Sequence, residues 1–274
     1  MAKICFITAI YGAYEATCKK FVRQSIQTDF ICFTDNKYIK SNGWLIDTTP
    51  YHILNKSNQD NDEYVNSLSN NKHTFNIAKY YKQAFHNIPR LQEYDIVVWI
   101  DGTIQITNEK TSEFVFNKVL KEGERILGWH HEKRFGSLEQ EVKETISFTK
   151  RYSTTFWHGQ SQPFQDAANQ WECYKNEGYD ESYFRTITHH GQLSSPHFGM
   201  WCTCFVAFLH KDSDVKKFLD LWYLQTLKYT TQDQIGFPFV VQKTGLIPFT
   251  LPDNEIKGRP HRKTDFFVKM PHHI

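Results

Sequence analysis

The sequence lacks the features that mark several large classes of protein. Its longest apolar runs fall far short of the roughly 20 residues that a membrane-spanning helix requires, so we expect no membrane span. A formal net charge of +2 gives no strong electrostatic case for binding nucleic acid or a membrane surface. No G-x-S-x-G motif is present, so a serine hydrolase is unsupported.

The cysteines do not follow the spacing of a zinc site. Cys5, Cys32, Cys202 and Cys204 lie in apolar, strand-like runs, where cysteine packs as a small core residue. Two histidines stand at 189–190, but neither they nor the cysteines show the paired C-x-x-C or H-x-x-x-H spacing of zinc ligands. Because the chain starts directly with an apolar strand and has no leader, we expect a reducing, cytoplasmic location.

The pattern of apolar residues predicts strands that alternate with amphipathic helices. The predicted strands are 3–10, 29–34, 44–47, 96–100, 126–129, 198–209 and 246–251, and the predicted helices are 15–26, 74–87, 112–121, 139–150, 163–177, 212–228 and 231–242. Residues 52–71 are predicted to form a long surface loop, and the tail after 251 to be irregular. With no repeat or linker, we expect one α/β domain over residues 1–274. Its sheet should be doubly wound, mostly parallel and covered by helices on both faces, as in Rossmann-like folds.

The most informative stretch is the apolar run 96–100, which ends at Asp101 and Gly102. A continuous apolar run is typical of a strand buried on both faces. Ligands of open α/β sheets bind outside the carboxyl ends of the strands, so Asp101 is expected at a binding site. The alternative is a hairpin turn carrying Asp-Gly, since an alternating run follows at 104–106.

Other features fit the same edge of the sheet. The turn that follows the first strand has a glycine, which lets backbone approach a nucleotide, and Asp35 ends the second strand. Two lysines on one face of the helix 74–87 would offset the charge of a diphosphate; the alternative is that they are simply solvated. The expected donor-binding residues are therefore Thr8, Tyr11, Gly12, Asp35, Lys79, Lys82, Asp101 and Gly102.

Together these features resemble the nucleotide-sugar half of a GT-A glycosyltransferase. More narrowly, the chain resembles a family of bacterial and plant cell-wall glycosyltransferase-like proteins, long catalogued as a domain of unknown function. The segments that carry the resemblance are KYYK at 79–82, WIDG at 99–102, HEKRFGSLE at 131–139, QWECYKNEGY at 170–179 and TQDQIGF at 231–237. The resemblance spans residues 3–245 and implies a nucleotide-sugar half at about 1–110, an acceptor half at about 111–250 and a C-terminal tail at 251–274.

The resemblance also implies residue roles. A nucleotide-sugar donor, such as a UDP-sugar, would lie across the strand ends with its diphosphate beside Asp101. Asp233 and Gln234 would open a helix that faces the sugar or the acceptor. The same cleft would be lined by His131, Arg134 and Glu139.

One departure concerns the metal. GT-A enzymes commonly bind Mn²⁺ or Mg²⁺ through Asp-x-Asp, whereas Thr103 stands here where the second acid would be. Either Asp101 binds a divalent metal with a distant group, for which His261 is the candidate, or no metal is used. In the second case the departing diphosphate would be stabilised by Lys79, Lys82, and Arg134 or Arg262.

The implied reaction is transfer of a hexose or pentose to an acceptor hydroxyl. An inverting enzyme needs a base, for which Asp233 is the first candidate and Glu139 the second; a retaining enzyme could use the leaving phosphate. The acceptor would be a saccharide, or a nucleic-acid base contacted by the basic run 257–263. The rival hypothesis is an inactive protein that binds nucleotide sugars or carbohydrate on the same fold.

Overall fold

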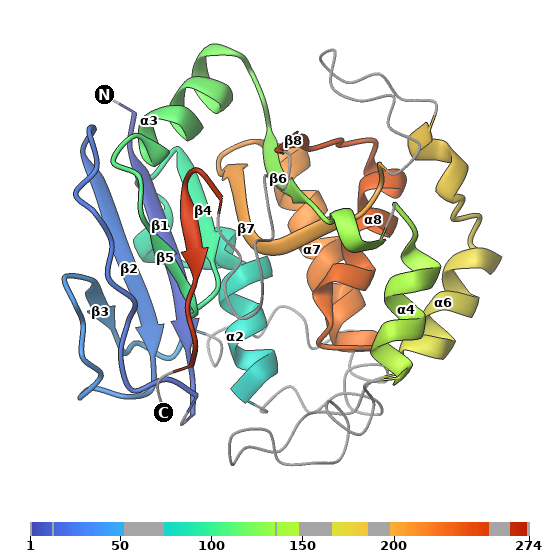
Figure 1. Cartoon of the computed structure of the whole chain (residues 1–274), viewed down its shortest axis with the longest axis horizontal. Coiled ribbons are helices and arrows are strands. Elements are labelled where there is room, and N and C mark those ends of the chain that lie inside the picture. The colour runs from blue at the N-terminus through green and yellow to red at the C-terminus, as the bar shows by residue number, and fades with distance from the viewer. Residues whose placement is uncertain are drawn as a thin grey trace.

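The computed structural model describes residues 2–12, 14–51, 74–134, 136–147, 166–185, 198–251 and 264–272. Its centre is a seven-stranded sheet with the strand order β3-β2-β1-β4-β7-β6-β8 (Figure 1). The strands are β1 (Ile4–Ile10), β2 (Thr28–Thr34), β3 (Leu45–Asp47), β4 (Ile96–Ile100), β6 (Ile126–His130), β7 (Trp201–Leu209) and β8 (Phe249–Leu251). The predicted α/β class with a mostly parallel sheet is confirmed.

The direction of the strands changes at β7. Strands β1 to β4 run parallel to one another, and β8 runs parallel to β6. Strand β7 is antiparallel to both of its neighbours, β4 and β6. All five residues of β4 are buried, as its continuous apolar run predicts. The sheet is therefore parallel except for β7, which joins the larger part, β3-β2-β1-β4, to the smaller part, β6-β8.

Helices cover both faces of the sheet, but unequally. One face carries α2 (Thr74–Gln83), α4 (Leu138–Ser147), α6 (Ala167–Asn176), α7 (Ser213–Lys228) and α8 (Asp233–Thr244). The other face carries α3 (Thr111–Phe116), its π-helical continuation Asn117–Lys121 and non-helical chain. Short 3-10 helices lie at Phe85–Asn87, Pro89–Leu91, Glu132–Arg134 and Glu181–Arg185. None of the helices in the described part of the chain has both the length and the apolar character needed to cross a membrane.

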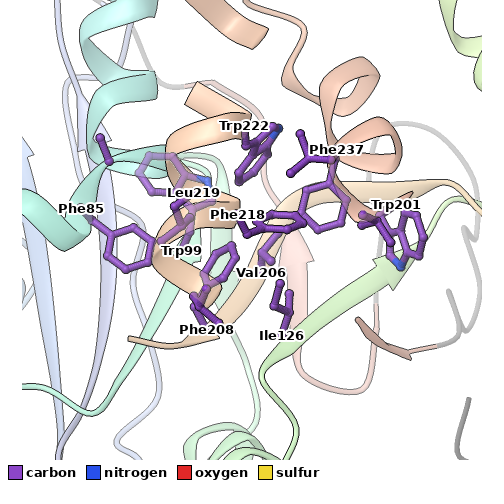
Figure 2. Packing of buried hydrophobic residues seen from close by; sticks show 14 of the residues in the cluster. Phe85, Trp99, Ile126, Trp201, Val206, Phe208, Phe218, Leu219, Trp222 and Phe237 are labelled. Carbon is purple, nitrogen blue, oxygen red and sulfur yellow. The ribbon is translucent and has the colours of Figure 1, made fainter. Parts of the chain in front are cut away.

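The helix-rich face is packed mainly with aromatic side chains (Figure 2). Phe218 and Trp222 of α7 contact Phe237 of α8, with ring centroids 5.2 and 5.0 Å apart. The indole Nε1 of Trp222 also donates a hydrogen bond to the backbone oxygen of Asp233 at 2.8 Å. This packing fixes the start of α8 against α7, so the side chain of Asp233 has a defined position.

The predicted helix over residues 15–26 is wrong. This segment is non-helical, and its backbone pairs with distant chain: Cys18 N donates to Lys40 O at 2.9 Å, and Val22 N donates to Ile106 O at 3.2 Å. Phe21 stacks on Phe30 of β2 with ring centroids 3.7 Å apart. These tertiary contacts outweigh a helix-like spacing of apolar residues.

The C-terminal region also differs from the prediction. Residues Phe267–Lys269 form β9, which pairs antiparallel with β5 (Ile104–Ile106) in a separate two-stranded sheet. Strand β5 therefore does not form a hairpin with β4, which removes the alternative interpretation of Asp101-Gly102. The predicted loop at 52–71 lies outside the described residues. The other predicted strands and helices are present, with ends shifted by a few residues, except that residues 148–150 and 163–165 of two predicted helices lie outside the described residues.

Candidate functional site

The carboxyl ends of β1 and β4 meet at the point where the strand order reverses. Strands β2 and β3 lie on one side of β1, and β4 lies on the other. Ligands of open α/β sheets bind in the crevice outside such a switch point. A Cβ added to Gly102 would lie 3.3 Å from Ile10 Cγ1, so the missing side chain allows a close approach between the two strand ends. A pocket lined by Ile10, Asp101 and Gly102 lies at this predicted edge of the sheet.

Asp101 lines this pocket. Its Oδ1 accepts a hydrogen bond from the indole Nε1 of Trp99 at 2.8 Å, and Lys82 Nζ lies 3.5 Å from the same oxygen. The Asp101 side chain is 40% exposed, so its carboxylate faces both protein and the cleft.

Lys82 is the buried centre of the site, with a side chain only 1% exposed. Its Nζ lies 2.6 Å from Asp233 Oδ2 and donates to Thr203 Oγ1 at 3.2 Å. The ammonium also lies 5.6 and 5.7 Å from the ring centroids of Trp99 and Trp222. A charge this deeply buried is costly unless it is paired, and here carboxylates and two indole rings provide the pairing.

Asp233 is the first residue of α8 and forms ion pairs with both of the predicted lysines. Its Oδ2 accepts from Lys79 Nζ at 2.9 Å, and its Oδ1 accepts from Thr203 Oγ1 at 2.9 Å. The first turn of a helix favours a negative charge. Lys79 and Lys82 lie one turn apart on α2, as predicted. Both therefore form an ion pair with the same carboxylate, that of Asp233, which is more than 150 residues away in sequence for each of them.

The pKa shifts follow from burial and charge. Burial alone would raise the pKa of Asp233, but the Lys79 and Lys82 ammonium groups lower it to about 2. Burial also lowers the pKa of Lys79, with Lys82 adding repulsion. In Lys82 the opposing attraction of Asp101 and Asp233 exceeds the burial effect and raises the pKa. Asp233 is thus a stable anion and a weak proton acceptor.

The cleft has an apolar compartment and a polar compartment. The apolar compartment holds about 220 Å³, and its aromatic wall consists of Tyr11, Tyr14, Phe75 and Trp99. The polar compartment holds about 260 Å³, and its charged and amide side chains are Lys79, Asp101, Arg134, Glu141, Glu144, Gln232, Asp233, Gln234 and Lys269. Lys79, Asp101 and Lys269 line both compartments, so they mark the junction between them.

Of the six residues predicted from the resemblance, five line the polar compartment, namely Asp101, His131, Arg134, Asp233 and Gln234. Arg134 Nε and Gln234 Nε2 bind the two oxygens of a buried carboxylate, that of Glu141, at 2.5 and 3.0 Å. Glu139, expected in the same cleft, instead lies exposed on α4, where it forms an ion pair with Lys143 at 2.9 Å.

Sequence reasoning missed two acids of α4 that do line the polar compartment, Glu141 and Glu144. Glu144 is partly exposed and forms no ion pair with any residue that the structure describes. The i,i+4 spacing of Glu139 and Lys143 is typical of a solvated helix face. That spacing could have directed attention to the acids at 141 and 144.

The other residues that were predicted to bind the donor lie at different positions in and around β1. Tyr11 lines the apolar compartment, and its hydroxyl donates to Tyr81 Oη at 2.7 Å. The backbone N of Gly12 donates to the two Asp35 oxygens at 3.2 and 3.1 Å, so Asp35 holds the turn after β1 and lies outside the compartment. Thr8 is buried in β1 and does not line either compartment.

A contact between Glu15 and His272 at the apolar compartment was not predicted. Glu15 and His272 line this compartment, and His272 Nδ1 lies 2.6 Å from Glu15 Oε1. The other Glu15 oxygen accepts from Lys19 Nζ at 2.7 Å, and both of these side chains are buried. The C-terminal segment is thereby attached to the wall of the cleft.

The donor set does not fit a preformed metal site. Among the described residues, no group of three or more His, Cys, Asp or Glu side chains is arranged to hold an ion. Asp101 is accompanied by the Lys82 ammonium, and Asp233 by two ammonium groups, where a metal would need further oxygen ligands. His261, the predicted second ligand, lies outside the described residues.

No family model matches the sequence, and no curated protein matches it. In structure, the chain is similar to mouse xyloside xylosyltransferase 1 in its apo form, with a TM-score of 0.46 and 8% identity over 91% of this chain and 84% of that one. It is also similar to the apo structure of WbbM, a bifunctional glycosyltransferase, with a TM-score of 0.46 and 12% identity over 87% of this chain. The chain spans 37% of the length of WbbM. Structural similarity at this level does not identify an activity or the role of any residue.

Proposed function

We propose that the chain is a glycosyltransferase that moves a sugar from a nucleotide-sugar donor to an acceptor hydroxyl. The observation that supports this most directly is the cleft at the β1–β4 switch point, in which an aromatic and a polar compartment meet at Lys79 and Asp101. Aromatic walls suit a nucleoside, and hydrogen-bonding side chains suit a sugar. Cationic side chains at the junction suit the diphosphate between them.

The size of the cleft fits a ligand with two dissimilar ends. The compartments hold about 220 and 260 Å³. Each is smaller than the roughly 300 Å³ at the lower end of small-molecule sites. A ligand of nucleotide-sugar size would therefore occupy both compartments and extend across the junction between them.

The proposed reaction breaks the bond between the anomeric carbon and the diphosphate oxygen and forms a bond from that carbon to the acceptor oxygen. Lys79, held by Asp233, stabilises charge on the departing diphosphate. Asp101 accepts a hydrogen bond from a hydroxyl of the donor. The weak basicity of Asp233 makes it a positioning residue for the two lysines.

For an inverting reaction we propose Glu144 as the acceptor of the hydroxyl proton. It lines the polar compartment, whereas Glu141 in the same compartment is already bound to Arg134. A general base must be able to take up a proton, and a carboxylate in a close ion pair is a poor acceptor. Glu139 is the weaker candidate, because it is exposed, paired with Lys143 and does not line the compartment.

The same observations favour a second candidate, a binding protein without turnover. The two buried acids of the polar compartment, Asp233 and Glu141, are both neutralised by cations. In that case the cleft would bind a nucleotide sugar and catalyse nothing.

A ligand screen followed by a turnover assay tests the proposal. Nucleoside diphosphates and their sugars, hexosyl and pentosyl, would be added to the protein with and without Mn²⁺ while thermal unfolding is followed. A ligand specific for the folded state raises the melting temperature. Each stabilising donor would then be incubated alone, with saccharides and with nucleic acid. Transfer or donor hydrolysis supports the enzyme, and binding alone supports the second candidate. No stabilisation by any of these compounds contradicts both.

A further inference from the structure

The last described segment of the chain, residues 264–272, returns to the cleft beside β4. Strand β9 pairs with β5 in the register that places Lys269 opposite Ile104. The next residue, Met270, donates its backbone N–H to Thr103 O at 2.8 Å. Because Thr103 and Ile104 lie two and three residues after Asp101, this pairing fixes residue 269 close to the carboxyl end of β4.

The segment is also attached on its far side. The contact of His272 Nδ1 with Glu15 Oε1, at 2.6 Å, connects it to the wall of the apolar compartment. Glu15 is itself buried and paired with Lys19. Two attachments, one on each side of Lys269, hold the backbone of this residue over the junction, which reduces the entropy lost when its side chain binds a ligand.

The charges at the junction show why a further cation is needed there. Lys79 and Lys82 contribute two positive charges, and Asp101 and Asp233 contribute two negative ones, so this buried group is close to neutral. A diphosphate placed beside it would meet two carboxylates as well as two ammonium groups. Lys269 lines both compartments at this point and adds a positive charge to the junction.

We propose that Lys269 binds the leaving diphosphate of the nucleotide sugar, which is an inference that rests on the proposed function. A nucleoside in the apolar compartment and a sugar in the polar compartment would place the diphosphate at the junction. Lys269 then contacts the phosphate farther from the nucleoside, and Lys79 contacts it from the α2 side. Lys82, 1% exposed, acts beneath them by holding Asp101 and Asp233.

Binding of diphosphates and monophosphates to variants tests this role. We would measure the dissociation constants of ADP, CDP, GDP and UDP, and of the matching monophosphates, by titration calorimetry. Lys269→Met keeps the length of the side chain, Lys269→Ala removes it, and Lys269→Arg keeps the charge. Lys143→Ala is the control, because Lys143 is 68% exposed and lines neither compartment. Thermal unfolding of each variant shows that it is folded.

We expect Lys269→Met and Lys269→Ala to weaken binding of the diphosphate that the wild type prefers by about 10- to 100-fold, as for a lost charged hydrogen bond. Binding of the matching monophosphate should stay within about 2-fold, and Lys269→Arg should recover most of the loss. Equal weakening of both ligands, or none, overturns the role of Lys269 and leaves the proposed function intact. If no diphosphate binds the wild type, both proposals fail.

Discussion

The two compartments of the cleft are built in different ways. The apolar compartment uses residues at or near the ends of β1 and β4, two parallel strands that are paired side by side, together with the start of α2 and the C-terminal segment. The polar compartment brings together α2, α4, β7 and α8, and its central ion pair joins Lys79 to Asp233 across 154 residues of sequence. Strand topology places the strand-end residues of the apolar compartment, whereas the packing of several helices places the polar compartment. The strand-end part of the apolar compartment is therefore the part of the cleft that sequence patterns describe best.

The difference also suggests a division of labour. The apolar compartment offers surface for binding, and the polar compartment offers the groups that can move protons or stabilise charge. Substitutions in the polar compartment should then change turnover and stability, and those at the junction should change both binding and turnover.

The largest effect is expected from Glu144→Gln. If Glu144 takes the acceptor proton, its amide variant should lower kcat by about 10²- to 10⁴-fold, the usual contribution of a general base. Binding of the nucleoside diphosphate should not change. Glu139→Gln, on the exposed face of the same helix, is the matched control and should keep full activity. Equal rates for wild type and Glu144→Gln would remove Glu144 from the reaction and break the division of labour.

Asp233→Asn should cause the largest loss of stability. It leaves Lys79 and Lys82 buried without the carboxylate they share, and breaking a buried pair costs about 3–5 kcal/mol. Urea unfolding measures the change. The control is Asp220→Asn, whose side chain is 65% exposed and paired with His86, with an expected loss under about 1 kcal/mol. Similar losses in the two variants would mean that the buried cluster does not stabilise the polar compartment.

Asp101→Asn should lower the activity of the junction without destabilising the fold. The asparagine oxygen can still accept the Trp99 indole hydrogen bond, and the side chain is 40% exposed, so the melting temperature should shift little. Transfer should fall by about 100-fold or more, because the site loses a charged group that orients donor and lysines. A variant with wild-type transfer rates would show that the site lies elsewhere.

The smallest expected effect is a decrease in the free energy of unfolding at acidic pH. The pKa of Asp233 is about 2 in the folded protein, below its value of about 4 in an unfolded chain. A lowered carboxyl pKa stabilises the fold fully above about pH 4, and this contribution disappears as the pH falls toward 2. The expected loss is on the order of 2 kcal/mol. Chemical unfolding at several pH values should show it in the wild type and not in Asp233→Asn.

The sequence predicted the parts of the fold that local patterns determine. The apolar run 96–100 identified the central strand, and its position before Asp101 identified the edge that forms the cleft. The spacing of Lys79 and Lys82 correctly placed both on one face of α2. Their shared partner was not predicted, because nothing local links α2 to the start of α8.

Other parts depend on contacts that a single sequence does not display. The segment 15–26 has apolar residues at helix-like intervals, yet its backbone bonds to Lys40 and Ile106 keep it non-helical. Strand β9 is only three residues long and gains its structure from β5. The direction of β7 is likewise set by its neighbours. For these elements, tertiary pairing decides the conformation, and propensity does not.

The return of the C-terminal segment to the cleft has a practical consequence for preparing the protein. In Figure 1 the two ends of the chain lie on the same flank of the molecule, the N-terminal end at the top, by the start of β1, and the C-terminal end at the bottom. An affinity tag or fusion partner joined after Ile274 would be separated from His272, and so from the Glu15 contact, by only two residues. Purification and immobilisation through the N-terminal end would leave that wall of the cleft undisturbed.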